Sequence, residues 1–134
     1  MPLDTSEQTT IETEADARPP LWSGHIFVPA RDLAASSRFY EAIGMRPVFV
    51  SEEIAVLELR GGTHLIIRPT IEAAGGPAGF DLMVEDIAAT HESWRAAGLS
   101  VSRLEHARIH DSFTVTDPSG NTIVVNNSHV IGVV

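Results

Sequence analysis

The residues of this sequence that could do chemistry are mainly histidines and arginines, because its 134 residues contain no cysteine. A chain without cysteine has no thiol nucleophile, no thiolate metal site and no disulfide. The six histidines have imidazole side chains that can bind a metal or transfer a proton near neutral pH. No catalytic Ser/His/Asp order, phosphate-binding loop or carboxylate pair accompanies them. The positions of the histidines in the fold therefore decide what chemistry is available.

Two of the histidines begin apolar runs that are typical of strands. His25 opens the run over residues 25–28, and His64 opens the run over residues 64–67. Because side chains alternate between the two faces of a strand, His64, Ile66 and Arg68 are predicted to share one face. Arg68 could bind a carboxylate of a ligand in a bidentate manner, or it could pair with a glutamate of the chain.

An internal repeat shows which elements position these strands. Residues 32–45 align without a gap on residues 86–99, and five of the fourteen positions are identical. Each copy begins with an aspartate that suits a helix N-cap and ends near a glycine that suits the position after a helix. The spacing of apolar residues between them predicts helices over 33–43 and 87–97.

Short strand-like runs precede and follow each predicted helix. Turn-forming residues separate the last two runs of each copy, with Gly-Gly in the first and Asp-Pro-Ser-Gly in the second. Each copy is therefore predicted to be a βαβββ module, one over about residues 24–70 and the other over about residues 79–127. Residues 71–78, which hold two glycines and a proline, are predicted to be the linker.

Composition and charge limit the class of protein. The formal net charge is -9, which argues against binding to nucleic acid or to an anionic membrane. No long apolar stretch predicts a membrane span, and without a recognisable secretory signal we expect a cytoplasmic protein. Residues 1–20 are acidic and are predicted to form a disordered tail, which leaves residues 21–134 as a single domain.

The sequence resembles the vicinal oxygen chelate superfamily, which contains glyoxalase I, bleomycin-resistance proteins and extradiol dioxygenases. The resemblance rests on residues 25–33, on Arg38-Phe-Tyr40 and Gly44-Met45 after them, and on the turn over 117–121. It covers about residues 24–127. It implies an α+β fold in which the two modules form an open, curved, mixed β-sheet around a cleft, with the helices packed outside.

The resemblance also implies where a metal would bind. In metal-dependent members, a divalent cation lies in the cleft and is bound by side chains from the first and last strands of each module. In this sequence those positions are assigned to His25, Ile66, Phe80 and Val124. Only His25 can ligate a cation, and a stable site needs several protein ligands. We therefore expect neither a metal at this position nor a cofactor.

A shifted metal site is the alternative. His25 and His64 could share a cation with either His110 or Asp111, which lie just before the seventh predicted strand. Such a set would have to meet the strict geometry of metal coordination. This alternative requires the fold to bring these side chains close together.

The predicted ligand site is a cleft with an aromatic and apolar lining and a few polar groups, as is typical of small-molecule pockets. Asn126, which the repeat aligns with Arg68, would add a hydrogen-bond donor and an acceptor. The predicted lining residues are Trp22, His25, His64, Ile66, Arg68, Phe80, His110, Val124 and Asn126.

Two classes of function fit these observations. The first is a metal-independent protein of the bleomycin-resistance type that binds a small organic molecule, such as a drug or a toxic metabolite. The second is an enzyme similar to glyoxalase or the dioxygenases, with a rearranged metal site or with His25 as a general base. The resemblance and the apolar end over residues 130–134 also predict a homodimer.

Overall fold

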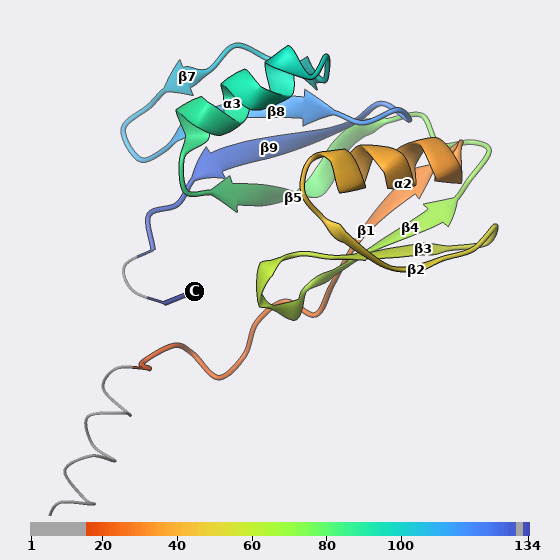
Figure 1. The fold of residues 1–134 in the computed structure, drawn as a ribbon, viewed down its shortest axis with the longest axis horizontal. Helices are drawn as coiled ribbons and strands as arrows, with labels where there is room; N and C mark the ends of the chain where they lie inside the picture. Colours follow the sequence, from red (N-terminus) through yellow and green to blue (C-terminus); the bar gives the residue numbers. More distant parts are fainter. Residues whose placement is uncertain (1–15, 131–132) are drawn as a thin grey trace, which may run out of the picture.

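The computed structural model describes residues 16–130 and 133–134, and Figure 1 shows their arrangement. Each of two modules contains one helix and one mixed sheet, and the two sheets do not close into a barrel. The α+β class and the two βαβββ modules predicted from the repeat are thus confirmed. Of the predicted acidic tail, residues 1–15 lie outside the described residues, and residues 16–24 form neither helix nor strand.

The first module contains four strands. Its elements are β1 (His25–Ala30), α2 (Leu33–Ala42), β2 (Arg46–Val50), β3 (Ala55–Glu58), the 3-10 turn η1 (Arg60–Gly62) and β4 (His64–Pro69). The strand order is β1-β4-β3-β2, with β1 parallel to β4 and the other pairs antiparallel. This order places β4 beside β1, so the side chains of the two strands that carry His25 and His64 are neighbours.

The second module repeats this topology with one addition. Its elements are β5 (Gly76–Val84), α3 (Ile87–Ala96), β6 (Ser100–Val101), β7 (Glu105–His106), β8 (Asp111–Thr116) and β9 (Asn121–Asn127). The strand order is β5-β9-β8-β6, and β7 pairs with β8 beyond the end of β6. β7 was not predicted, because it is only two residues long. The linker was also placed too far along the chain, since β5 begins at Gly76.

Both helices begin at the aspartates that the repeat identified. The Asp32 carboxylate accepts the Ala35 N–H at 3.1 Å, and the Asp86 carboxylate accepts the Ala89 N–H at 3.0 Å. Each satisfies a backbone donor that the first turn of a helix leaves without a partner. The helices end one residue earlier than predicted, and a glycine with positive φ follows each end within two residues. No helix among the described residues is long and apolar enough to cross a membrane.

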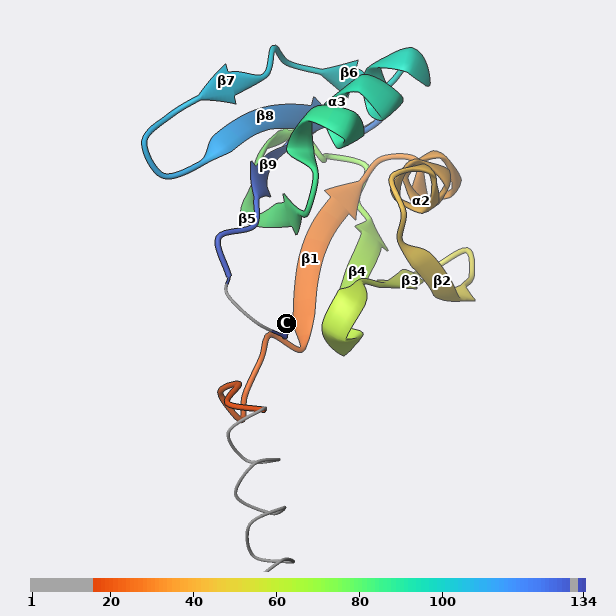
Figure 2. The ribbon, with the colours of Figure 1, turned by 60° about the vertical axis from the view of Figure 1, so that its left-hand side comes forward.

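Each helix covers one face of its own sheet (Figures 1 and 2). Strand side chains alternate between that covered face and the opposite face. In β1, Val28 and Ala30 face the helix and are buried, whereas His25 and Phe27 are exposed on the other side. The largest fully buried apolar and aromatic side chains are Tyr40, Phe113, Leu57, Leu65, Ile67, Ile123, Val28, Val115 and Val125. The faces opposite the helices are therefore the surfaces that the fold leaves available for a ligand.

Phe80 does not lie on the exposed face to which it was assigned. It is half-buried and packs against the core, and the pairing of β5 with β9 is irregular between Pro77 and Asp81. The physical reason is the two-residue period of a strand. Phe80 lies six residues before the Asp86 cap, the same spacing as Ile26 before Asp32, and Ile26 also packs against the core. The expectation that Phe80 lines the ligand face is wrong, and Asp81 points to that face instead.

A buried group of hydrogen bonds joins the two modules through Asp117. The Tyr40 hydroxyl, from α2, donates to Asp117 Oδ2 at 2.8 Å, and the Asn121 amide donates to the same oxygen at 2.8 Å. The N–H groups of Ser119 and Asn121 donate to Oδ1 at 2.9 Å each. Burial, together with the neighbouring Asp117 carboxylate, raises the pKa of the Tyr40 hydroxyl, so this group remains a donor.

The same turn also holds the end of β1 and the linker. The Asn121 amide donates to the Pro29 carbonyl at 2.9 Å, and Ser119 Oγ accepts the Arg31 N–H at 2.9 Å. The Gly76 N–H donates to the Gly120 carbonyl at 3.0 Å. The turn over 117–121 thus fixes the position of the second module relative to β1. We refer to this group of contacts as the closed junction.

Candidate functional site

The exposed face of the first sheet carries a row of polar side chains that crosses all four strands. Arg46 pairs with Glu58, Glu58 pairs with His64, and His64 pairs with His25 in the strand register. The two imidazole rings are stacked with centroids 6.1 Å apart. Hydrogen bonds from the Arg46 guanidinium hold the pKa of the Glu58 carboxyl below its ordinary value, so this carboxylate is ionised at neutral pH.

A second row on the same face is apolar. It consists of Phe49, Val56, Ile66 and Phe27, in adjacent positions of the four strands. Phe27 is 53% exposed and Phe49 is 56% exposed, although both are large apolar side chains. The Arg68 guanidinium carbon lies 5.6 Å from the centre of the Phe27 ring, within the range of a cation–π contact. This face therefore offers apolar contact beside a positive charge.

The exposed face of the second sheet has a different chemistry. Its strands contribute hydroxyl and amide side chains, namely Ser112, Thr114, Thr116, Thr122 and Asn126. The Asn126 amide donates to the Asp81 carboxylate at 2.8 Å, which orients both side chains. Met83 and Val124 are the apolar members of this face, and they are 45% and 41% exposed. It can form many neutral hydrogen bonds but has no arginine.

The structure divides the predicted ligand residues into three sets. His25, His64, Ile66 and Arg68 share the exposed face of the first sheet, and Val124 and Asn126 share that of the second. Phe80 belongs to the core, as described above. Trp22 and His110 lie elsewhere and are treated separately.

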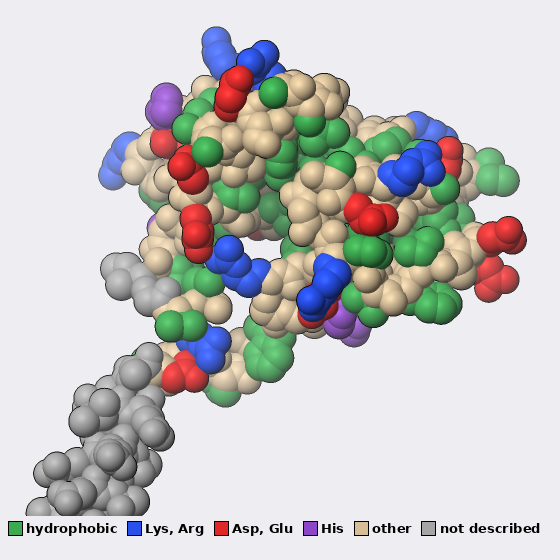
Figure 3. Space-filling model, viewed as in Figure 1, with side chains coloured by type: hydrophobic (Ala, Val, Ile, Leu, Met, Phe, Trp, Pro, Cys, Tyr) green, Lys and Arg blue, Asp and Glu red, His purple; other side chains and the backbone are tan. Residues whose placement is uncertain are grey.

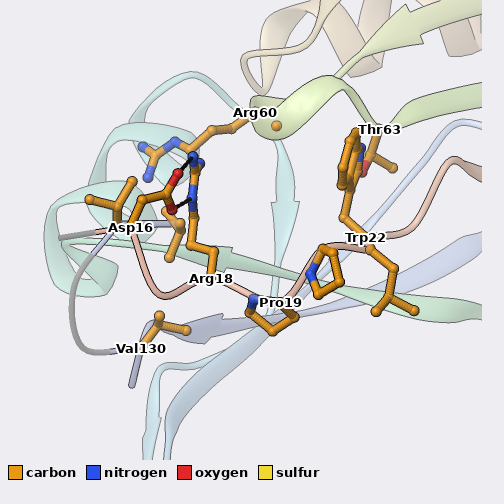
Figure 4. Close-up of a pocket in the computed structure, with 12 residues that line it drawn as sticks. Asp16, Arg18, Pro19, Trp22, Arg60, Thr63 and Val130 are labelled. Atoms are coloured by element: carbon orange, nitrogen blue, oxygen red, sulfur yellow. Dashed lines mark hydrogen bonds and ion pairs between the residues drawn. The ribbon is translucent and has the colours of Figure 1, made fainter. Parts of the chain in front are cut away.

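Trp22 precedes β1 and is 70% exposed. It lines a cavity of about 650 Å³ between the N-terminal segment, η1 and the C-terminal segment, where the Asp16–Arg18 ion pair lies on the opposite side (Figure 4). His110 packs its ring against His129 and places Nδ1 3.1 Å from the Asn127 carbonyl. Neither residue is in contact with the rows of the first sheet.

The side chains of the exposed faces that were not predicted include Phe27, Phe49, Asp81 and Met83. The signal for Phe27 and Asp81 was present, because alternation from His25 leads to Phe27 and the matching position in the second module is Asp81. Met83 follows from Asp81 by the same rule. Phe49 could not be assigned to a face, because β2 contains a register shift between Pro47 and Phe49.

The residues at the metal positions of the resembling superfamily do not fit a metal. The spacing of His25 from Asp32 recurs at Gly79, which therefore replaces Phe80 as the position in the first strand of the second module. His25 is then grouped with Ile66, Gly79 and Val124, and the other three have no ligating side chain. The alternative set of His25, His64 and His110 or Asp111 is not assembled either. Within residues 16–130 and 133–134, no group of three or more metal-binding side chains is close enough to hold a cation.

The sequence was compared with models of known protein families. Residues 22–125 match the family model described as the Glyoxalase/Bleomycin resistance protein/Dioxygenase superfamily. That match spans well over half of the chain. No curated protein matches the sequence at a significant level.

Solved structures with the same fold include binding proteins and an enzyme. A bleomycin-binding protein from Streptomyces verticillus, complexed with copper(II)-bleomycin, is 20% identical with a TM-score of 0.68, and the match covers 84% of this chain and 100% of that one. An antibiotic binding protein from Streptomyces sp. CB03234 is 18% identical with a TM-score of 0.70, covering 82% and 98%. A lactoylglutathione lyase from Agrobacterium tumefaciens is 19% identical with a TM-score of 0.69, covering 83% and 96%.

At these identities the solved structures show a common fold and do not assign a ligand or a reaction. The family itself is shown by the model match over residues 22–125 and agrees with the paired modules. The chain belongs to the Glyoxalase/Bleomycin resistance protein/Dioxygenase superfamily.

Proposed function

We propose that this chain is a metal-independent small-molecule-binding protein of the bleomycin-resistance type. The observation that carries the proposal is the pair of exposed phenylalanines in the apolar row of the first sheet, Phe27 and Phe49, with Arg68 beside Phe27. Large apolar side chains that gather on an exposed surface mark binding sites more often than isolated ones do. Since His25 is the single ligating side chain at the family's metal positions, the proposal needs no cation.

The chemistry of the two faces suggests the kind of ligand. A planar aromatic group would lie on the row that contains Phe27 and Phe49, and an anionic substituent would pair with Arg68. The hydroxyl and amide groups of the second sheet would bond polar substituents of the same molecule. The bleomycin-binding protein and the antibiotic binding protein that share this fold support a drug or toxic metabolite as the ligand.

Calorimetric titration with aromatic acids and glycopeptide drugs tests this proposal. Replacing Arg68 with alanine is expected to weaken binding of an aromatic acid about tenfold, since a charge-assisted contact contributes about 1.5 kcal/mol or more. The matched control is Arg103→Ala, because Arg103 is 88% exposed and pairs with Glu105 away from the apolar row. Equal affinities for the wild type and Arg68→Ala would remove Arg68 from the site.

The row of His25, His64 and Glu58 favours a second candidate, an enzyme that uses His25 as a general base. The Glu58 carboxylate lies next to His64, which stacks on His25. Its negative charge can stabilise the positive charge that forms when His25 accepts a proton from a substrate. His25→Ala separates the two candidates. Under the binding proposal this variant keeps most of its affinity, whereas an enzyme would bind its substrate and lose turnover.

We also propose that the protein is a cytoplasmic homodimer. Three valines of the C-terminal segment, Val130, Val133 and Val134, are about half exposed or more in the single chain. A second copy packed there would remove this apolar surface from water. Analytical ultracentrifugation is expected to give twice the mass of 14.4 kDa. Val133→Asp should shift the protein toward the monomer, and a wild type that is monomeric at all concentrations would contradict the proposal.

A further inference from the structure

The two modules meet at two places that the repeat makes equivalent, but only one of them is closed. The turn over 59–63 has the same backbone bonds as the turn over 117–121. The Leu59 N–H donates to the Thr63 carbonyl at 2.8 Å, as the Asp117 N–H donates to the Asn121 carbonyl at 2.9 Å. Leu59 is therefore the counterpart of Asp117.

The helix residue that corresponds to Tyr40 also differs in the second module. In the repeat, Trp94 of α3 aligns with Tyr40 of α2. At the closed junction the Tyr40 hydroxyl bonds to Asp117, whereas at the equivalent place the corresponding residues are Trp94 and Leu59, which cannot form such a bond. Both belong to the hydrophobic core, and both also line a cavity of about 700 Å³. We refer to this cavity as the inter-module groove.

The inter-module groove has a mostly apolar wall. The apolar side chains that line it are Ile43, Met45, Leu59, Leu82, Met83, Val84, Trp94, Val130 and Val134. Its volume lies within the range of small-molecule sites, which is about 300–1,000 Å³. The space-filling view shows the molecule hollowed between the two modules (Figure 3). The groove is separate from the rows of the first sheet, because none of their residues lines it.

The charged groups of the groove lie at its rim. Arg60 Nη1 contacts Glu85 Oε1 at 3.0 Å, and Asp86 supplies a second carboxylate. The side chains of Arg60 and Glu85 are 66% and 76% exposed, so their ion pair contributes less than about 1 kcal/mol. The rim therefore has one cation against two carboxylates, in a chain whose formal net charge is -9. This balance complements a cationic ligand and repels an anionic one.

We propose that the inter-module groove binds a lipophilic amine. The apolar body of the amine lies between Leu59 and Trp94, and its protonated nitrogen pairs with Glu85, where it displaces the Arg60 guanidinium. This site differs from the proposed sheet-face site in position and in the charge that it selects. It does not depend on the ligand proposed for the sheet face, although Val130 and Val134 of its wall also belong to the proposed dimer contact.

The test uses phenylbutylamine, phenylbutanol and phenylbutanoate, which share one apolar body and differ in charge. The protein is the full chain with Trp22→Phe, because the sequence has two tryptophans. Trp94, which is 8% exposed and lines the groove, then remains as the sole tryptophan. Binding is expected to change Trp94 fluorescence and to weaken in the order amine, alcohol, carboxylate.

Substitutions in the Trp22→Phe protein test whether Glu85 binds the protonated amine. Glu85→Gln is expected to weaken amine binding about fivefold, the upper range for an exposed ion pair, and to leave alcohol binding unchanged. Glu53→Gln is the control of equal net charge, since Glu53 lies in the exposed turn between β2 and β3, outside the groove. Thr90→Phe is expected to fill the groove and to weaken binding of all three probes, and circular dichroism checks its fold.

Three results would overturn the proposal. They are equal affinity for the amine and the carboxylate, equal loss in Glu85→Gln and Glu53→Gln, and no loss of any probe in Thr90→Phe. Arg68→Ala shows whether the probes bind in the inter-module groove or at the sheet face. If Arg68→Ala weakens carboxylate binding while amine binding stays unchanged, both sites stand. If it weakens amine binding as much as Glu85→Gln does, the probes bind at the sheet face and the inter-module site is rejected.

Discussion

Replacing Asp117 with alanine is expected to lower the free energy of unfolding by about 3–5 kcal/mol. The Asp117 carboxylate is 4% exposed and accepts four hydrogen bonds. Without it, the Tyr40 hydroxyl and the backbone donors of the turn are left buried without partners, at about 1–3 kcal/mol for each unsatisfied group. Chemical denaturation followed by circular dichroism measures the change.

Two further variants make this result specific to the closed junction. Tyr40→Phe removes one of the four donors and keeps the ring, so a loss of about 1 kcal/mol is expected. Asp81→Ala removes an exposed carboxylate that bonds to Asn126 and should change stability by about 0.5 kcal/mol or less. If Asp117→Ala is no less stable than Asp81→Ala, the closed junction does not hold the modules together.

Gly75→Ala is expected to lower the free energy of unfolding by about 3 kcal/mol. Gly75 has a φ of +83°, and a Cβ built on it would lie 2.6 Å from the Gly120 carbonyl oxygen. The left-handed conformation alone costs a residue with a Cβ about 1–2 kcal/mol, and overlap with the backbone of the turn adds about 1–3 kcal/mol. The linker and the turn at Gly120 would have to move apart.

Gly79→Ala is the matched control for the glycine prediction. Gly79 has nearly the same φ, +82°, but a Cβ there meets nothing within 4 Å. This variant should therefore lose only about 1–2 kcal/mol, from the backbone conformation alone. Thermal denaturation of both variants gives the comparison. Equal losses in the two would show that contact with Gly120 contributes nothing.

Local signals in the sequence predicted the modules correctly. The Asp32 and Asp86 caps, the glycines after the helices and the gapless alignment between them depend on residues close together in the chain. The alternation that groups His64, Ile66 and Arg68 is also local, because the three residues follow one another at a spacing of two in β4. These features needed no information about tertiary contacts.

The error at Phe80 was local, because the spacing from Asp86 already makes Phe80 the counterpart of the core residue Ile26 and places Asp81 on the exposed face. The other errors concern contacts that are distant in sequence. Trp22 was assigned to the sheet face, but its position is set by η1 and the C-terminal segment, which no periodicity in the sequence predicts. The closed junction was also missed, since Asp117 and Tyr40 are 77 residues apart and the Asp-Pro-Ser-Gly motif was interpreted as a turn alone.

The contrast between the closed junction and the inter-module groove determines how the modules can move. Separating the closed junction would expose a buried carboxylate and several hydrogen bonds, whereas the Arg60–Glu85 ion pair at the groove is exposed and weak. We therefore expect relative motion of the modules to change the width of the groove more readily than it separates the closed junction.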